Sequence, residues 1–383
     1  MTKLPLPTQT EIQTHNILVE KLREYSEAND NWISFSKFME VVLYDKADGY
    51  YIKKNDNFGV QGDFITAPMI SNLFAETFLM QFQLIFNHTN SIILECGPGN
   101  GFFCRDIMLA AKHRKIQIDR YYLLEVGIES VKKQKKILQE CLTKSDYKKI
   151  QWVNEIPVQF DGVVFMNEFI DALPIDIFLK KNKKIVEKGL TFDNGRLIWK
   201  YKNILPLTIP SEWLSNLKTD YLFEHSSQYE KWIKQLDTSI YRGAVIIADY
   251  GFSHHEFFHP DRHQGTIMCH YRHLAHSDPL VNLGSQDITS HVNFSYLAKL
   301  FSENNFLIEA FQSQANFLLN NGILRCLAKY DPHNTKEYLK KTMGLQKLLS
   351  PSEMGDLVKV LVISKNIEID FSYLNSQDKS FQL

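Results

Sequence analysis

The sequence has few of the features that mark exported or membrane-bound proteins. Its five cysteines form no C-x-x-C pair and leave an odd one over, which favours reduced thiols over a disulfide scaffold. The longest apolar runs are strand-sized, far below the ~18 residues that cross a membrane. The first 20 residues contain no apolar signal segment and carry acidic side chains that transit peptides avoid. We therefore expect a soluble, cytoplasmic protein.

The charge also shows no bias of one sign. The 43 Lys and Arg residues oppose 44 Asp and Glu residues, so the net charge is -1 and no overall field attracts nucleic acid or anionic lipid. Hydrophobic residues make up 44% and charged residues 23%, close to the globular average, which excludes disordered and collagen-like classes. We expect no nucleic-acid partner and no membrane insertion.

Short apolar segments that alternate with helix-like segments predict the core. The strand-like segments are 91–96, 121–126, 150–153, 162–166 and 243–250. This alternation is typical of an α/β fold with a mostly parallel sheet that is covered on both faces. Two final apolar segments, 306–312 and 356–364, fit an antiparallel pair of strands at one edge.

The segments outside this pattern predict the domain organisation. Residues 1–90 form a helical N-terminal extension with a lid loop, and residues 91–383 form the core. Two insertions, at about 180–240 and 251–290, follow the fourth and fifth strands, where α/β folds place substrate-binding segments. The first insertion contains Asp-Asn-Gly at 193–195, which is typical of a hairpin turn.

A glycine-rich turn follows the first predicted strand. Its G-x-G-x-G spacing differs from the G-x-G-x-x-G of dinucleotide sites, which disfavours a nicotinamide oxidoreductase. The acid that precedes it is unwelcome beside a pyrophosphate but suits a cationic ligand, such as the amino group and sulfonium of S-adenosylmethionine. A turn that holds no ligand is the alternative. The candidate cofactor residues here are Glu95, Gly97, Pro98, Gly99 and Gly101.

Polar residues also follow the next two strands. Glu125 ends the second strand, where a carboxylate can accept hydrogen bonds from both ribose hydroxyls of an adenosyl group. A solvated strand-end glutamate is the alternative. Asn154 follows the third strand, where such folds contact the edge of the adenine. These positions support S-adenosylmethionine as the cofactor.

The segment after the fourth strand carries the candidate catalytic residues, Asn167, Glu168 and Asp171. Loops after strands one and four flank the ligand crevice of an open α/β sheet. Glu168 and Asp171 are three residues apart, so they share one face if the segment begins a helical turn. Paired carboxylates would hold a cationic acceptor such as a guanidinium. The alternative is a helix cap at Asp171 and a surface Glu168.

Two compositional features are less specific. Seven of the 13 histidines lie at 254–276, but no pair has the familiar helical zinc spacing with a catalytic glutamate, so we expect no metal. We expect a folded loop in which histidines, Tyr271 and Arg272 form hydrogen bonds across the crevice. The basic run at 132–136 is expected to be a solvated helix face.

Several separated motifs, taken together, resemble the MidA-type class I methyltransferases. The resemblance covers residues 30–365, and the motifs occur in a single order: GDFITAP (62–68), ECGPGNG (95–101), NEFIDALP (167–174), IADYGF (247–252), HYRH (270–273), SDPLVNLGSQDITSHVNF (277–294), SQANFLL (313–319) and MGDLVKVLVIS (354–364). It implies a seven-stranded, Rossmann-like class I methyltransferase fold with S-adenosylmethionine as methyl donor. The family's mitochondrial member methylates an arginine of a complex I subunit, which implies a protein substrate such as a respiratory-complex subunit.

The resemblance also implies roles for individual residues. It assigns the glycine turn to the cofactor, Glu125 to the ribose, and the polar residues after the fourth strand to the reaction site. It assigns Asp63, Thr66 and Pro68 to a lid over the methionine end of the cofactor. The chain departs from the family pattern at three positions, namely Met69, Ala75 and Asn100.

We therefore expect a protein-arginine N-methyltransferase that uses S-adenosylmethionine. Two alternatives stay open because of Met69 and Asn100: methylation of another acceptor, and a cofactor-binding assembly factor or scaffold without turnover. A homodimer also stays open, since the N-terminal helices and the insertions offer additional apolar surface.

Overall fold

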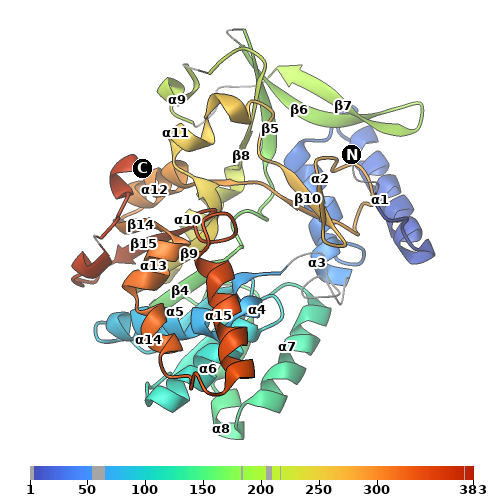
Figure 1. Cartoon of the computed structure of the whole chain (residues 1–383). Helices are drawn as coiled ribbons and strands as arrows, with labels where there is room; N and C mark the ends of the chain where they lie inside the picture. The colour runs from blue at the N-terminus through green and yellow to red at the C-terminus, as the bar shows by residue number, and fades with distance from the viewer. Residues whose placement is uncertain (1–3, 54–64, 183, 204–208, 216, 375) are drawn as a thin grey trace. The chain divides into compact units, whose positions relative to one another are not determined.

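The computed structural model describes residues 4–53, 65–182, 184–203, 209–215, 217–374 and 376–383. The chain divides into two compact units, each built from three stretches of sequence (Figure 1). The first unit contains residues 1–64, 171–231 and 252–296, and the second contains 65–170, 232–251 and 297–383.

A mostly parallel sheet forms the centre of the second unit. The sheet has eight strands, seven of which follow the order β14-β15-β9-β4-β1-β2-β3. Strands β9, β4, β1, β2 and β3 are parallel, whereas β15 is antiparallel to both of its neighbours. The predicted antiparallel edge pair is confirmed, and the predicted count of seven strands is close to the observed eight. The strands are β1 Ile92–Cys96, β2 Arg120–Leu124, β3 Ile150–Val153, β4 Phe160–Asn167, β9 Ile240–Phe252, β14 Leu307–Ser313 and β15 Val358–Lys365.

Both faces of this sheet are buried, as the continuous apolar runs predict. The consecutive residues Val163, Val164, Phe165 and Met166 of β4 are all fully buried, although they alternate between the two faces. A half-solvated sheet would show polar residues at every second position. The pattern is typical of parallel strands with packing on both sides.

Aromatic side chains pack helices against one face of the sheet. Phe74, Phe78 and Phe82 recur every four residues along α5 and so share one side of that helix. They pack against Phe103 of α6 and Phe165 of β4, whose rings stack with centroids 4.2 Å apart. The helices that lie wholly or partly in the second unit are α4 Ala67–Ile70, α5 Asn72–Phe86, α6 Phe102–Arg114, α7 Ile128–Cys141, α8 Lys144–Tyr147, α10 Ser227–Ser239, α12 Phe294–Glu303, α13 Gln314–Asn320, α14 Ile323–Leu327 and α15 Thr335–Leu349.

The first unit combines helices with two small antiparallel sheets, ordered β7-β6-β5-β8 and β11-β10-β12. The predicted hairpin is confirmed, because Asp193 of β6 pairs with Arg196 of β7 and both turn residues between them have positive φ. Its helices are α1 Gln9–Glu27, α2 Phe35–Tyr44, α3 Tyr50–Lys53, α9 Ser211–Ser215 and α11 His254–Phe257. Its strands are β5 Asp176–Lys181, β6 Lys184–Asp193, β7 Arg196–Asn203, β8 Tyr221–His225, β10 Met268–Tyr271, β11 Leu274–His276, β12 Asp287–Thr289 and β13 Val292–Asn293.

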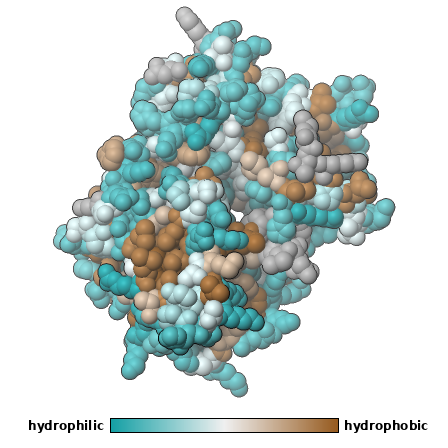
Figure 2. Space-filling view, viewed as in Figure 1, coloured by the Kyte–Doolittle hydropathy of each residue, from teal (hydrophilic) through white to brown (hydrophobic). Residues whose placement is uncertain are grey.

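The surface of the second unit carries one visible apolar area. Figure 2 shows it over α13 and α14, where Leu319 and Leu324 are exposed. None of the helices described for this chain is both long and apolar enough to span a bilayer.

Candidate functional site

The turns that carry most of the predicted site follow the carboxyl ends of strands in the middle of the large sheet. Glu95 of β1 lies beside Leu123 of β2 and beside Phe165 of β4 in the strand register. The chain continues from β1 to β2 on one side, whereas β4 lies on the other side. This is a topological switch point, where open α/β sheets bind ligands at the carboxyl ends of their strands.

The glycine turn after β1 has a backbone that requires glycine. Gly97, Gly99 and Gly101 have φ values of 68°, 54° and 80°, in the left-handed region that side chains disfavour. A Cβ at Gly97 would also lie 2.8 Å from Cδ2 of Phe169. The turn closes when the Gly101 N–H donates to the Pro98 carbonyl at 2.8 Å, and α6 begins immediately afterwards. The tight turn that the spacing predicts is confirmed.

The departure at Asn100 keeps this turn intact. The Asn100 side chain is buried, and its Oδ1 accepts the Phe102 N–H at 3.1 Å. That N–H belongs to the first turn of α6 and has no partner within the helix. Asn100 therefore stabilises the junction between the turn and the helix.

Glu95 places a carboxyl group behind the glycine turn. Its side chain is only 4% exposed, and Oε2 accepts a hydrogen bond from the Tyr121 hydroxyl at 2.6 Å. Desolvation by burial raises the pKa of Glu95 to about 8, and the nearby Glu125 adds to the rise, whereas the Tyr121 bond opposes it. A buried carboxylate gains most from a cationic partner, so Glu95 fits a ligand that brings a positive charge.

Glu125 lies just after β2 and is also constrained. Oε1 accepts the Gly127 N–H at 2.8 Å, and Oε2 accepts from Nε2 of Gln134 at 2.9 Å. Burial raises the pKa of Glu125, and these two bonds act against the rise. Asn154 is exposed beyond the end of β3. The ribose role of Glu125 and the adenine role of Asn154 stay predictions.

Glu168 is the most constrained acid of the site. It follows β4 with a φ of 50°, and its N–H donates to the Ala248 carbonyl at 2.9 Å. Its Oε1 accepts from the Ala67 N–H at 3.3 Å and from Nδ2 of Asn167 at 3.1 Å. The other amide atom of Asn167, Oδ1, is buried without a hydrogen-bond partner in the described part of the chain. It is an acceptor available to a ligand.

These contacts connect the reaction site with the predicted lid. Thr66 is the residue that precedes α4, and Pro68 is buried in its first turn, directly after the Ala67 N–H that Glu168 accepts. Asp63, the third predicted lid residue, lies outside the described residues.

The predicted helical pairing of Glu168 with Asp171 is wrong. Residues 168–175 form bends and turns rather than a helix, because Glu168 is left-handed. Asp171 is buried and belongs to the first unit, where its carbonyl accepts the Ser290 N–H at 3.0 Å. The next element after Asp171 is strand β5, so no helix begins there for it to cap.

Asp249 is a structural acid that the sequence analysis did not identify. It is fully buried in β9, and Oδ2 accepts the N–H groups of Phe169 at 3.1 Å and Ile170 at 2.8 Å. Oδ1 accepts its neighbour Tyr250 N–H at 2.8 Å. The sequence signal that could have identified Asp249 is an acidic residue near the end of an otherwise apolar strand. Asp249 holds the backbone that presents Glu168.

Asp249→Ala is expected to lower the free energy of unfolding by about 3 kcal/mol, because it leaves up to three backbone N–H groups without their acceptor. Urea denaturation followed by fluorescence measures this change. Asp356→Ala, at an exposed position, is the matched control with an expected change near zero. An Asp249→Ala protein as stable as the control would contradict the assigned role.

The histidine-rich segment lies in the first unit. The Tyr271 hydroxyl and the Arg272 guanidinium both donate to Oε2 of Glu11 in α1, at 3.2 and 2.7 Å. The expected hydrogen bonds across the crevice stay a prediction. Throughout the described ranges, no three His, Cys, Asp or Glu side chains form a group that could hold a metal ion.

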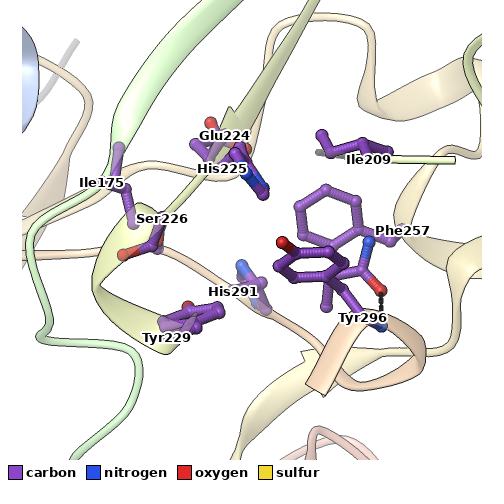
Figure 3. Close-up of a pocket in the computed structure, with 11 residues that line it drawn as sticks. Ile175, Ile209, Glu224, His225, Ser226, Tyr229, Phe257, His291 and Tyr296 are labelled. Carbon is purple, nitrogen blue, oxygen red and sulfur yellow. Dashed lines mark hydrogen bonds between the residues drawn. The ribbon is translucent and has the colours of Figure 1, made fainter. Parts of the chain in front are cut away.

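A small cavity also lies in the first unit (Figure 3). Its lining includes His225, His291 and Tyr296, and its volume of about 10 Å³ is enough for one water molecule. Burial lowers the pKa of His225 to about 4, so this histidine is neutral at physiological pH. The Tyr296 N–H donates to Oδ1 of Asn293 at 3.1 Å. The cavity is too small for a nucleoside.

Comparisons with known proteins cover most or all of the chain. A crystal structure of a protein from Burkholderia thailandensis bound to S-adenosyl-homocysteine matches with a TM-score of 0.94 and 31% identity, over 100% of both chains. A native crystal structure of a protein from the same organism gives 0.90 and 32%, also over 100% of both chains. The mitochondrial protein arginine methyltransferase NDUFAF7 of Bos taurus is 27% identical, over 86% of this chain and 80% of its own length. The Homo sapiens protein of that name is also 27% identical, over 85% and 78%.

The residues present fit the cofactor that these comparisons indicate. The glycine turn has a left-handed backbone without side chains, which lets a ligand approach closely, and Glu95 suits a cationic amino acid end. The model of the S-adenosyl-L-methionine-dependent methyltransferases matches residues 73–310, which is more than half of the chain. The chain therefore belongs to this family of methyltransferases, and S-adenosylmethionine is its cofactor.

Proposed function

We propose that this methyltransferase transfers the methyl group to an arginine side chain of a partner protein. The observation that carries the proposal is the Glu168 carboxylate, which is held at the switch point by Asn167 and by the backbone of α4. A carboxylate can bind a guanidinium in plane through two parallel hydrogen bonds. The relatives from Bos taurus and Homo sapiens are named protein arginine methyltransferases, which supports this acceptor.

Several residues of the second unit would hold the cofactor. Glu95 would pair with its amino group and sulfonium, Glu125 would accept the ribose hydroxyls, and Asn154 would contact the adenine edge. The glycine turn would let the ligand approach the backbone, with Thr66 and Pro68 over the methionine end. When bound, the cofactor supplies a methyl group on a cationic sulfonium that becomes a neutral thioether.

The chain's own contribution is to orient the acceptor and remove its proton. A guanidinium nitrogen becomes a nucleophile only when its lone pair is directed at the methyl carbon and its proton has an acceptor. Glu168 would provide both functions, and the free Oδ1 of Asn167 would accept a further N–H. Positioning supplies most of the rate enhancement in such a displacement. A role for Asp171 as a second carboxylate stays a prediction.

The nature of the partner and the compartment are also part of the proposal. The family resemblance supports a respiratory-complex subunit as a substrate. The five free cysteines support the reducing cytoplasm. Methylation of another acceptor, or cofactor binding without turnover, are the competing functions. Transfer of labelled methyl groups into protein, followed by amino acid analysis, distinguishes all three outcomes.

The elevated pKa of Glu95 predicts a pH-dependent affinity for the cofactor. Glu95 with a pKa of about 8 holds a proton at neutral pH in the free protein, and a cationic ligand must displace that proton. Affinity for S-adenosylhomocysteine is therefore expected to fall by up to about tenfold for each pH unit below 8, since one proton is released on binding. Calorimetric titration between about pH 6 and pH 7 measures the slope, because the ligand's α-amino group stays protonated there.

Glu95→Gln is the matched variant for this experiment. The amide has no proton to lose in this range, so its affinity should be weaker and nearly independent of pH. A wild-type affinity that does not change with pH would contradict the pairing of Glu95 with the cofactor's positive charge.

A further inference from the structure

We propose that Gln134 is a positioning residue of the cofactor site, and that its side-chain amide joins the glycine turn to the ribose acid Glu125. Gln134 lies on α7 and is fully buried, although the residues on either side of it are lysines. Nε2 donates to the Gly99 carbonyl at 2.8 Å and to Oε2 of Glu125 at 2.9 Å. One side chain thus connects two segments predicted to contact different parts of the same cofactor.

The orientation of this amide is determined by its partners. The indole N–H of Trp152, in β3, donates to Oε1 of Gln134 at 2.8 Å. An indole nitrogen is only a donor, whereas a carbonyl and a carboxylate are only acceptors. The amide can therefore satisfy all three partners in one orientation alone, because a flipped amide would place donor against donor at Trp152.

Packing adds to these hydrogen bonds. A Cβ at Gly101 would lie 3.3 Å from Cγ of Gln134, so the side chain fills the space beside the last glycine of the turn. Oε1 of Glu125 is bound to the Gly127 N–H, which leaves Gln134 as the group that fixes Oε2. The carboxylate is thereby held with both oxygens oriented before the ligand arrives, which lowers the entropy cost of binding.

The inference rests on the proposed ribose role of Glu125. If Gln134 positions this carboxylate, a change at Gln134 should act mainly on recognition of the ribose hydroxyls. A residue with a merely structural role would instead weaken all ligands equally, or would only lower thermal stability.

Gln134→Glu is the first test. It places a carboxylate against Glu125 and the Gly99 carbonyl, so affinity for S-adenosylhomocysteine at about pH 7.5 should fall at least about tenfold. The loss relative to wild type should shrink at about pH 5.5, because two facing carboxylates then share a proton. Gln139→Glu, at an exposed position on the same helix, is the control and should bind as wild type does at both pH values. A Gln134→Glu protein with wild-type affinity at both would overturn the proposal.

Gln134→Met and Trp152→Phe complete the test with calorimetric titration of S-adenosylhomocysteine and its 2′,3′-dideoxy analogue. Trp152→Phe leaves Gln134 in place, keeps an aromatic ring in β3 and removes the donor to Oε1 of Gln134. This variant can still test the proposal if Gln134→Met does not fold. Both variants should lose most of the wild-type preference for the ligand with hydroxyls. Folded variants that keep the full preference would overturn the role of Gln134. A wild-type protein without any preference would instead overturn the ribose role of Glu125, on which the inference rests.

Discussion

Glu168→Gln is expected to reduce methyl transfer by at least about 100-fold, which is the size of a lost general base. The substitution keeps the shape of the side chain, and its carbonyl oxygen can still accept from the Ala67 N–H and from Asn167. What it removes is the negative charge that orients a guanidinium and the site that accepts its proton. Turnover with labelled S-adenosylmethionine measures the loss.

The same variant should bind the cofactor normally. The predicted contacts after β1, β2 and β3 do not involve Glu168, and the amide oxygen of Gln can still accept the Ala67 N–H that lies between Thr66 and Pro68, so the dissociation constant for S-adenosylhomocysteine should change by less than about threefold. Glu368→Gln, an exposed position in the second unit, serves as control for the loss of one charge. A Glu168→Gln protein that keeps its turnover would exclude Glu168 as the base.

Gly97→Ala is expected to weaken binding of S-adenosylhomocysteine by at least about 30-fold. Two costs add together: about 1 kcal/mol or more for a side chain at a φ of 68°, and a similar cost for the contact at 2.8 Å with Phe169. The ring cannot retreat easily, because Asp249 holds the Phe169 N–H. The turn must therefore shift, and its backbone loses the geometry that binds the ligand.

Gly195→Ala tests the backbone strain of a side chain at positive φ without the steric contact. Gly195 has a φ of 77° in the β6–β7 hairpin and no atom within 4 Å of an added Cβ, so this variant has the backbone strain without the contact. It should lose some thermal stability and keep full cofactor affinity. Adding Phe169→Ala to Gly97→Ala should restore part of the affinity. If Gly97→Ala alone binds as tightly as Gly195→Ala, the glycine turn is not the cofactor site.

Much of the fold could be predicted because its signals are local. Strands β1 and β4 contain uninterrupted apolar runs at 92–94 and 163–166 and are followed by turn residues, and the hairpin of the first unit is indicated by Asn194 and Gly195. The glycine turn was also predictable, since three alternating glycines after a buried strand allow few backbone paths.

The predictions that failed share a physical cause, which is contact between residues that are distant in sequence. The spacing of Glu168 and Asp171 suggested a helical turn, but Glu168 is left-handed, and Asp249, about 80 residues later, holds the backbone of Phe169 and Ile170 in a bend. Gln134 lies inside a basic run that was expected to be a solvated face. Lys132, Lys135 and Lys136 are exposed as expected, but Gln134 projects to the buried side of α7. No pattern within the run distinguishes it.

The most direct test of the central claim is to identify the amino acid that receives the methyl group. The protein would be incubated with methyl-labelled S-adenosylmethionine and extract from cells that lack it, and the labelled proteins would then be hydrolysed and separated. The account predicts label in methylarginine with the wild-type protein and about background label with Glu168→Gln. Label in another residue, or in small molecules only, would contradict the arginine acceptor. Tight cofactor binding without any labelled product would contradict the enzymatic role itself.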